Sequence, residues 1–142
     1  SCVVKGMSAG IGNPIFNKLS SRLAAAMMSI PSAKGFDYGA GFDAAAMRGS
    51  EHNDIFVADS DGIRTATNRS GGIQGGISNG EDIYFRVAFK PVASIGKRQQ
   101  TVDTHGNART IEIRGRHDVC IVPRVVPVVE SLAALVVLDL ML

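Results

Sequence analysis

The chain has 142 residues, of which 45% are hydrophobic and 20% are charged. That composition can bury a core and excludes an intrinsically disordered chain, so we expect one folded domain over residues 1–142. There are 15 Lys and Arg residues and 13 Asp and Glu residues, for a formal net charge of +2. So small a charge argues against nucleic acid or a membrane as the main partner. Basic residues are also not interleaved with aromatic ones, and Trp is absent.

The two cysteines, Cys2 and Cys120, are too few for a disulfide framework, and neither has a Cys or His partner at metal-ligand spacing. We therefore expect free thiols, no metal site and a cytoplasmic location. Cys120 is interpreted as a small buried hydrophobe. The N-terminus shows no basic stretch followed by an apolar run, so we expect no secretory signal.

The first part of the chain predicts a short strand, Ser1 to Lys5, and then an amphipathic helix. A glycine-containing loop leads to Asn13-Pro14, a helix cap followed by a first-turn proline. Pro31 is expected to end the helix. Apolar residues at spacings of three and four predict its buried stripe, made of Phe16, Leu19, Leu23, Met27 and Ile30.

The middle of the chain predicts mainly short strands. The alternation of residues 83–89 is the period-two pattern of a strand with two unlike faces. Ile111 and Ile113 alternate with charged residues in the same way and predict another strand. The weaker patterns predict a strand at 34–38, a short helix at 43–48 closed by Gly49, and a hairpin of 55–58 with 63–67 across Asp59-Ser60-Asp61-Gly62.

The C-terminal stretch from Val125 to Leu142 is apolar but is interrupted by Pro127, Glu130 and Asp139. It falls short of the about 20 apolar residues of a membrane span, so we interpret it as a buried helix from about Pro127. A helix without a polar face must be covered all round. We therefore expect residues 128–140 to be almost fully buried in the middle layer of a sandwich, and the chain to be a piece of a larger protein.

Residues 71–80 hold five glycines in ten positions, just before the clearest strand. They lack the Gly-Lys-Ser/Thr ending of a nucleotide-triphosphate loop and the Gly-x-Gly-x-x-Gly spacing of a dinucleotide site. Two interpretations remain open from composition alone. One is a loop whose backbone closely approaches a flat or bulky ligand, and the other is a long flexible connection.

The segment Arg114-Gly115-Arg116-His117-Asp118 combines two guanidinium groups, an imidazole and a carboxylate. Arginine binds phosphate or carboxylate through two parallel hydrogen bonds, and a neighbouring His or Asp can move a proton. The alternative is a surface turn with an internal Arg–Asp ion pair.

Lys90 to Ser94 place a lysine and a hydroxyl at the end of the clearest strand, where ligand sites tend to lie. This is weak evidence on its own, because Lys-Pro after a strand is common. We interpret Glu51 to Asp54 as a solvated polar turn and His105 as a loop residue.

Several of these segments, taken in order, resemble the C-terminal half of chorismate synthases. They are Ser29 to Gly35, Arg48 to Ser50, the GGIQGGISNGEDI run from Gly71 to Ile83, the turn at Lys90, and RGRHD from Arg114 with Pro123, Pro127 and Glu130 after it. The resemblance implies an α+β fold, part of a β-α-β sandwich with antiparallel sheets and helices in the middle layer, assembled as a homotetramer. It also implies a lyase that converts 5-enolpyruvylshikimate 3-phosphate to chorismate and phosphate by anti-1,4-elimination, with reduced FMN and a link to NADP.

The same resemblance implies roles for individual residues. Arg116 is expected to lie near the substrate phosphate, and Asp118 is the catalytic candidate, assisting proton transfer at the flavin. Ser32 stands where alanine is usual, and Val119 stands where proline is usual. The implied flavin-binding residues are Pro31, Ser32, Gly75, Lys90, Pro91, Val92, Ala93, Ser94 and Arg116.

The family's N-terminal motifs, including its catalytic histidines and several substrate-binding arginines, have no counterpart in this sequence. We therefore expect this chain alone to be inactive. The alternative function is a non-catalytic domain that associates with copies of itself.

Overall fold

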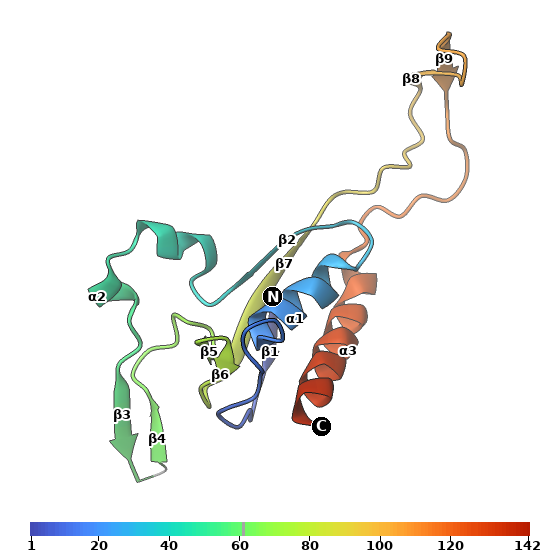
Figure 1. Cartoon of the computed structure of the whole chain (residues 1–142). Coiled ribbons are helices and arrows are strands. Elements are labelled where there is room, and N and C mark those ends of the chain that lie inside the picture. The colour runs from blue at the N-terminus through green and yellow to red at the C-terminus, as the bar shows by residue number, and fades with distance from the viewer. Residues whose placement is uncertain (61) are drawn as a thin grey trace.

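The computed structural model describes residues 1–60 and 62–142, and its centre is an antiparallel sheet (Figure 1). The sheet contains β1 (Cys2–Val4), β7 (Ile83–Phe89) and β2 (Ala33–Tyr38), in the order β1-β7-β2. All three strands were predicted from the sequence. The alternation of β7 buries Ile83 and Phe85 completely, and the Phe85 ring lies 5.6 Å from that of Phe36 on β2.

Two helices, α1 (Leu19–Met28) and α3 (Val122–Met141), pack against each other and share one hydrophobic core with the sheet. Because both contribute buried side chains to the cluster that contains Ile83 and Phe85, they cover the same face of the sheet. An ion pair between Arg22 and Asp139 joins the start of α1 to the end of α3, so the two helices run antiparallel. Helices and antiparallel strands together confirm the α+β class.

The predicted helix starts five residues later than expected, at Leu19 instead of Pro14. Asn13 and Asn17 exchange two backbone hydrogen bonds, which close the intervening residues into a separate loop. The helix begins where the Leu19 N–H donates to the Gly76 carbonyl at 2.8 Å. Phe16 therefore lies outside the helix and is 89% exposed, which corrects its place in the stripe, whereas Leu19, Leu23 and Met27 are fully buried as predicted.

After β2 the chain forms a 3-10 helix, η1 (Gly41–Ala46), and a one-turn helix, α2 (Gly49–His52). The predicted helix at 43–48 is thus shifted, and Gly49 starts α2 instead of closing η1. The predicted hairpin is confirmed in β3 (Phe56–Asp59) and β4 (Gly62–Thr65). Residue 61 of its expected turn lies outside the described residues.

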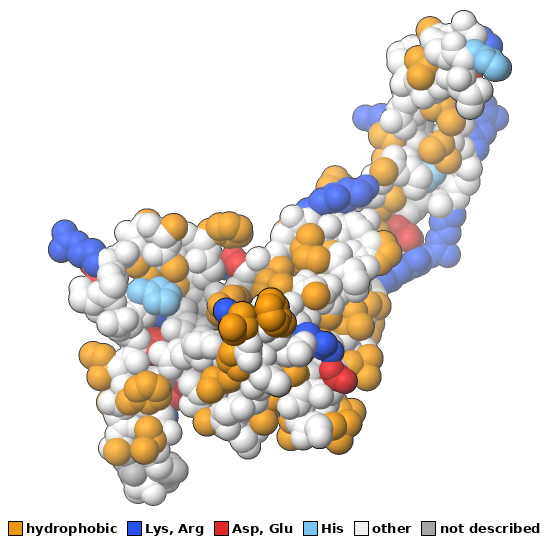
Figure 2. Space-filling model, in the orientation of Figure 1, with side chains coloured by type: hydrophobic (Ala, Val, Ile, Leu, Met, Phe, Trp, Pro, Cys, Tyr) orange, Lys and Arg blue, Asp and Glu red, His pale blue; other side chains and the backbone are white. Residues whose placement is uncertain are grey.

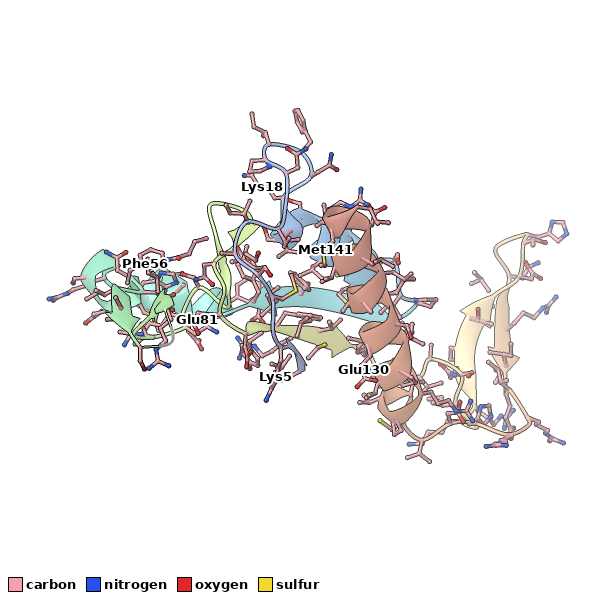
Figure 3. The ribbon with its side chains drawn as sticks, turned by 90° about the horizontal axis from the view of Figure 1, so that it is seen from below. Lys5, Lys18, Phe56, Glu81, Glu130 and Met141 are labelled. Carbon is pink, nitrogen blue, oxygen red and sulfur yellow. The ribbon has the colours of Figure 1, made fainter. Side chains whose placement is uncertain are left out.

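Two more hairpins follow. The glycine-rich segment forms β5 (Ile73–Gln74) and β6 (Ile77–Ser78), so it is an ordered turn and not a flexible connection. The second hairpin, β8 (Gln99–Val102) with β9 (Ala108–Ile111), projects from the body on two extended segments (Figures 1 and 3). The strand predicted around Ile111 and Ile113 ends at Ile111, and the pattern gave no sign of β8.

The C-terminal helix α3 is longer than predicted and less buried. It begins at Val122 and includes Pro127, and only Val129, Ala133 and Val136 are buried. Leu135 is 59% exposed and Leu138 is 54% exposed, so the expectation that every face is covered is wrong for this chain. One face of α3 packs on α1 and the sheet, and the helices form an outer layer here. Among the described residues, no helix is long and apolar enough to cross a membrane.

A buried carboxylate, Asp54, fastens the segment that follows the β3–β4 hairpin. It is 5% exposed and accepts hydrogen bonds from the Thr67 hydroxyl at 2.6 Å and from the Arg69 and Ser70 N–H groups at 2.8 and 2.7 Å. Burial raises the pKa of Asp54, but these hydrogen bonds outweigh burial and hold the pKa below its ordinary value. The interpretation of residues 51–54 as a solvated turn is therefore wrong for Asp54.

We expect Asp54→Asn to destabilise the chain by about 1–3 kcal/mol, because the amide NH2 would face backbone N–H groups that need an acceptor. The folded-state pKa is lower than the unfolded one, so the native contribution is present above about pH 5 and is lost as pH falls through about 4 and below. Urea unfolding should therefore show a difference in the free energy of unfolding between the parent and Asp54→Asn that is larger at neutral pH than at acidic pH. Asp82→Asn, which removes an exposed carboxylate, is the control, and an equal effect of both variants would contradict the prediction.

Candidate functional site

The candidate site lies at the end of the β2–β7 ladder, where Ser32 meets Lys90. The strands are antiparallel, with Ala33 opposite Phe89, so the residue before β2 faces the residue after β7. The Lys90 N–H donates to the Ser32 carbonyl at 2.9 Å. The structure thus brings together Pro31, Ser32 and Lys90, three of the residues predicted from the sequence.

The backbone at Ser32 is unusual. Its φ is +74°, and it is the one non-glycine residue with positive φ among the described residues. Such a conformation costs about 1–3 kcal/mol and tends to occur at functional sites. The ladder also shifts register between Ala33 and Gly35, directly beside it. The backbone at this end of the sheet therefore departs from regular strand pairing, both in the φ of Ser32 and in the register of the ladder.

Arg116 and Asp118 reach the same end of the molecule from the C-terminal side. Val122 and Val125, in the first turn of α3, line one hollow with Phe89, the last residue of β7, so the segment that leads into α3 ends near this end of the sheet. Asp118 is held there by an ion pair with Arg124, in the first turn of α3, at 2.8 Å. Figure 1 shows the returning segment entering α3 next to the end of β7.

The Arg114–Asp118 segment does not contain the internal ion pair that was the alternative interpretation. Asp118 pairs with Arg124 outside the segment, and the His117 ring contacts the Ile113 carbonyl at 3.0 Å. The Arg116 side chain is exposed and, among the described residues, has no hydrogen-bond or ion-pair partner. The same holds for the Lys90 ammonium group, which is half-buried.

Lys90 at the end of the sheet and Arg116, whose neighbour His117 lies against Gly96 on the projecting arm, are thus two cations without partners among the described residues. Both belong to a basic part of the chain. Residues 90–124 contain seven Lys and Arg residues and three Asp and Glu residues. Figure 2 shows basic side chains along the projecting arm. Residues 91–94 are irregular, and apart from half-buried Val92 they are exposed. Such a region can bind an anionic ligand such as a phosphate.

Gly75 lies elsewhere. It is in the β5–β6 turn, whose Gly76 carbonyl contacts the first residue of α1, and α1 separates this turn from Pro31 by about 15 Å along its axis. Gly75 has φ +61°, and a Cβ there would meet no atom within 4 Å, so the turn has an open face. Within this chain, Gly75 is not part of the group around Ser32.

One charged pair in the sheet was not predicted from the sequence. Arg86 on β7 and Asp37 on β2 form two parallel hydrogen bonds, Nε to Oδ1 at 2.8 Å and Nη2 to Oδ2 at 2.6 Å. The hydrogen bond from Arg86 is the main reason that the pKa of Asp37 lies below its ordinary value. The signal available in the sequence was Arg86 as the one charged residue of β7, with an opposite charge, Asp37, in the strand predicted at 34–38.

The remaining candidates agree in part with expectation. Both cysteines are free thiols, but Cys120 is exposed, which corrects its interpretation as buried. Burial, followed by the Glu130 carboxylate, raises the pKa of Cys2. His105 lies exposed in the β8–β9 turn, as expected. Within residues 1–60 and 62–142, no group of three or more His, Cys, Asp or Glu side chains could hold a metal ion.

Comparisons with known proteins agree with the resemblance. The family model described as chorismate synthase matches residues 1–142. Relatives named chorismate synthase include those of Methylacidiphilum infernorum, 56% identical over 97% of this chain and 38% of its own length, and Cytophaga hutchinsonii, 56% identical over 98% and 39%. One from Prochlorococcus marinus strain MIT 9211 is 58% identical over 97% and 38%.

A solved structure titled "Crystal Structure of Chorismate Synthase" has a TM-score of 0.73 and 30% sequence identity, over 95% of this chain and 34% of that one. The chain thus spans about two fifths of the length of the curated relatives it matches. Both the sequence match and the shared fold extend over almost all of its residues, so the chain belongs to the chorismate synthase family.

Proposed function

We propose that this chain supplies part of the FMN and substrate-phosphate site of a lyase that converts 5-enolpyruvylshikimate 3-phosphate to chorismate and phosphate. Family membership supports the reaction class. Because the chain spans about two fifths of its relatives, the activity is proposed for a protein of the relatives' length, in the cytoplasm and as a homotetramer.

The observation that carries the proposal is the meeting of Ser32 and Lys90 at the end of the β2–β7 ladder. The ladder fixes the backbone of Lys90 beside the left-handed backbone of Ser32, and Arg116 lies on the segment that returns from the arm to α3. Both cations lack partners among the described residues, so their charges are available to a ligand.

These residues fit FMN and a phosphorylated substrate. Lys90 and Arg116 would neutralise phosphate or an anionic flavin ring, with the guanidinium giving a two-pronged contact. Pro31 to Ser32 and Pro91 to Ser94 would line the flavin through backbone and small side chains. Bound FMN would supply electron density while the carbon–oxygen bond to phosphate breaks. Gly75 lies outside the group around Ser32, so it would contribute to this site only if the bound ligand itself reaches the β5–β6 turn.

Asp118 is proposed to assist the transfer of the proton that is lost in the elimination. Its Oδ2 accepts the hydrogen bond from Arg124, which orients the carboxylate and leaves Oδ1 for proton transfer. Arg124 would thus be a positioning residue for Asp118, a role that the sequence alone did not indicate.

The alternative, a non-catalytic domain that associates with copies of itself, is favoured by one observation. Leu135, Leu138 and Leu142 are exposed along α3 and form an apolar surface. FMN titration separates the two proposals, because a domain that only associates has no reason to bind flavin through Lys90 and Arg116.

We expect Arg116→Ala, in a chain of the relatives' full length, to weaken FMN or substrate binding about ten- to a hundredfold. A charge-assisted hydrogen bond of roughly 1.5–3 kcal/mol is lost, whereas the exposed side chain contributes little to folding. Arg116→Lys should recover only part of the affinity, because an ammonium group lacks the planar fork.

Fluorescence titration of FMN and a thermal melt measure these effects. Arg114→Ala is the matched control, since Arg114 is exposed, lies two residues away and removes the same charge. Affinities within about twofold of the parent, together with a large drop in melting temperature, would make Arg116 a structural residue and overturn the assignment.

The 142-residue chain alone should form no chorismate with reduced FMN, because the family's N-terminal histidines and arginines have no counterpart in it. Chorismate release is measured by absorbance under anaerobic conditions, with a full-length relative as the positive control. Turnover above the uncatalysed rate, in a sample whose intact mass matches this chain, would show that the catalytic groups are misplaced.

A further inference from the structure

A cavity of ≈ 480 Å³ lies between α1, β2, η1 and the segment that Asp54 fastens. This volume falls in the usual range for a small-molecule site. The hollow between the central sheet and the segment that contains η1 and α2 can be seen in Figure 2. None of the residues assigned above to FMN or substrate lines it. The cavity is therefore separate from the site at the end of the ladder.

The cavity has a positive side chain and no free negative one. Asp37 is the one acidic residue in its lining, and both carboxylate oxygens are occupied by Arg86. Arg69 also lines the cavity, and its guanidinium has no hydrogen-bond or ion-pair partner in the described part of the chain. An anion entering the cavity would meet an unpaired cation and a neutralised carboxylate.

Arg69 projects from a fixed backbone. Its N–H donates to the buried Asp54 carboxylate at 2.8 Å, and its carbonyl accepts a hydrogen bond from Ala40 at 2.6 Å. The neighbouring Ser70 N–H is also bound by Asp54. Since the backbone is held on both sides, the position of the Arg69 Cα is fixed without any contact by the side chain. A backbone that is already fixed lowers the entropy lost when a ligand binds.

Three more polar side chains in the lining are free to donate. The Ser20 and Ser21 hydroxyls, from α1, and the His52 ring, from α2, have no side-chain hydrogen bond within residues 1–60 and 62–142. Each can donate to a carboxylate or phosphate oxygen. The hydrogen-bonding capacity of these two hydroxyls and of the imidazole is expected to be used by water or by a polar ligand.

The rest of the lining is aromatic and apolar. Phe36 and Tyr38 come from β2, with ring centroids 6.3 Å apart, and Phe42 comes from η1. The Phe42 side chain is 80% exposed, an arrangement that leaves a large apolar surface at the cavity without protein cover. Aromatic walls favour a flat or cyclic ligand body.

We propose that this cavity binds a small cyclic anion, with the carboxylate or phosphate held by Arg69 and the two serine hydroxyls and the ring against Phe36, Tyr38 and Phe42. The site is distinct from the FMN site and does not depend on the proposed function. Its ligand chemistry is an anionic group attached to a ring.

The test is a titration of the 15N-labelled chain with benzoate and with phenyl phosphate, followed by amide chemical shifts. Saturable shifts are expected around Ser20, Tyr38 and Ser70. Benzyl alcohol, a neutral ring, and inorganic phosphate, an anion without a ring, should both bind at least about fivefold more weakly. Comparison of benzoate with phenyl phosphate then tells which anionic group the cavity prefers.

Arg69→Ala should weaken the binding of the preferred probe about tenfold or more, and Arg69→Lys less. Lys34→Ala, which removes an exposed cation on β2 outside the cavity, is the matched control and should leave binding unchanged. A dispersed amide spectrum verifies that each variant is folded, and Ser21→Ala provides a second, milder variant with an expected loss of about threefold.

Equal binding of benzyl alcohol and benzoate, shifts that do not saturate, or affinities of Arg69→Ala and Ser21→Ala within about 1.5-fold of the parent would overturn the proposal. Arg69→Ala should leave FMN binding by a full-length chain unchanged, whereas Arg116→Ala should leave benzoate binding unchanged. The two sites can therefore fail or succeed independently.

Discussion

The antiparallel pairing of β2 with β7 is the constraint on which the rest of the structure depends. The ladder places Ala33 opposite Phe89 and, after a register shift between Ala33 and Gly35, Asp37 opposite Arg86. At one end this pairing joins Ser32 to Lys90, and farther along the ladder it neutralises the carboxylate that lines the cavity. Because side chains alternate with a period of two, a slip of one residue would separate both pairs and expose Ile83 and Phe85. Burial of the β7 side chains thus fixes the position of the charged groups.

The packing of α1 on α3 contributes the second constraint. The antiparallel arrangement, joined by Arg22 and Asp139, directs the start of α3 toward the end of β7, where Val122 and Phe89 line one hollow. The Arg116–Asp118 segment, about 85 residues after Pro31 in the sequence, reaches the same end of the molecule for this reason. The core residues therefore determine where the basic segment returns, although the segment itself makes few contacts.

The sequence predicted those parts of the fold in which a repeating pattern of apolar residues corresponds to one buried face of a strand or helix. The alternation in β7 and the spacing of Leu19, Leu23 and Met27 were confirmed, since each reflects burial against a single neighbour. Phe16 follows the same spacing, but two backbone hydrogen bonds between Asn13 and Asn17 remove it from the helix. The apolar character of α3 indicated that it needs cover, but it could not indicate which faces this chain covers.

The candidate site was predictable only where the residues lie in one segment or where the family resemblance joins them. Lys90 and Arg116 could be named from strand ends and residue type, but nothing local indicated that Arg124 would pair with Asp118. The cavity around Arg69 was not predictable at all, because its lining comes from several separate stretches of the chain.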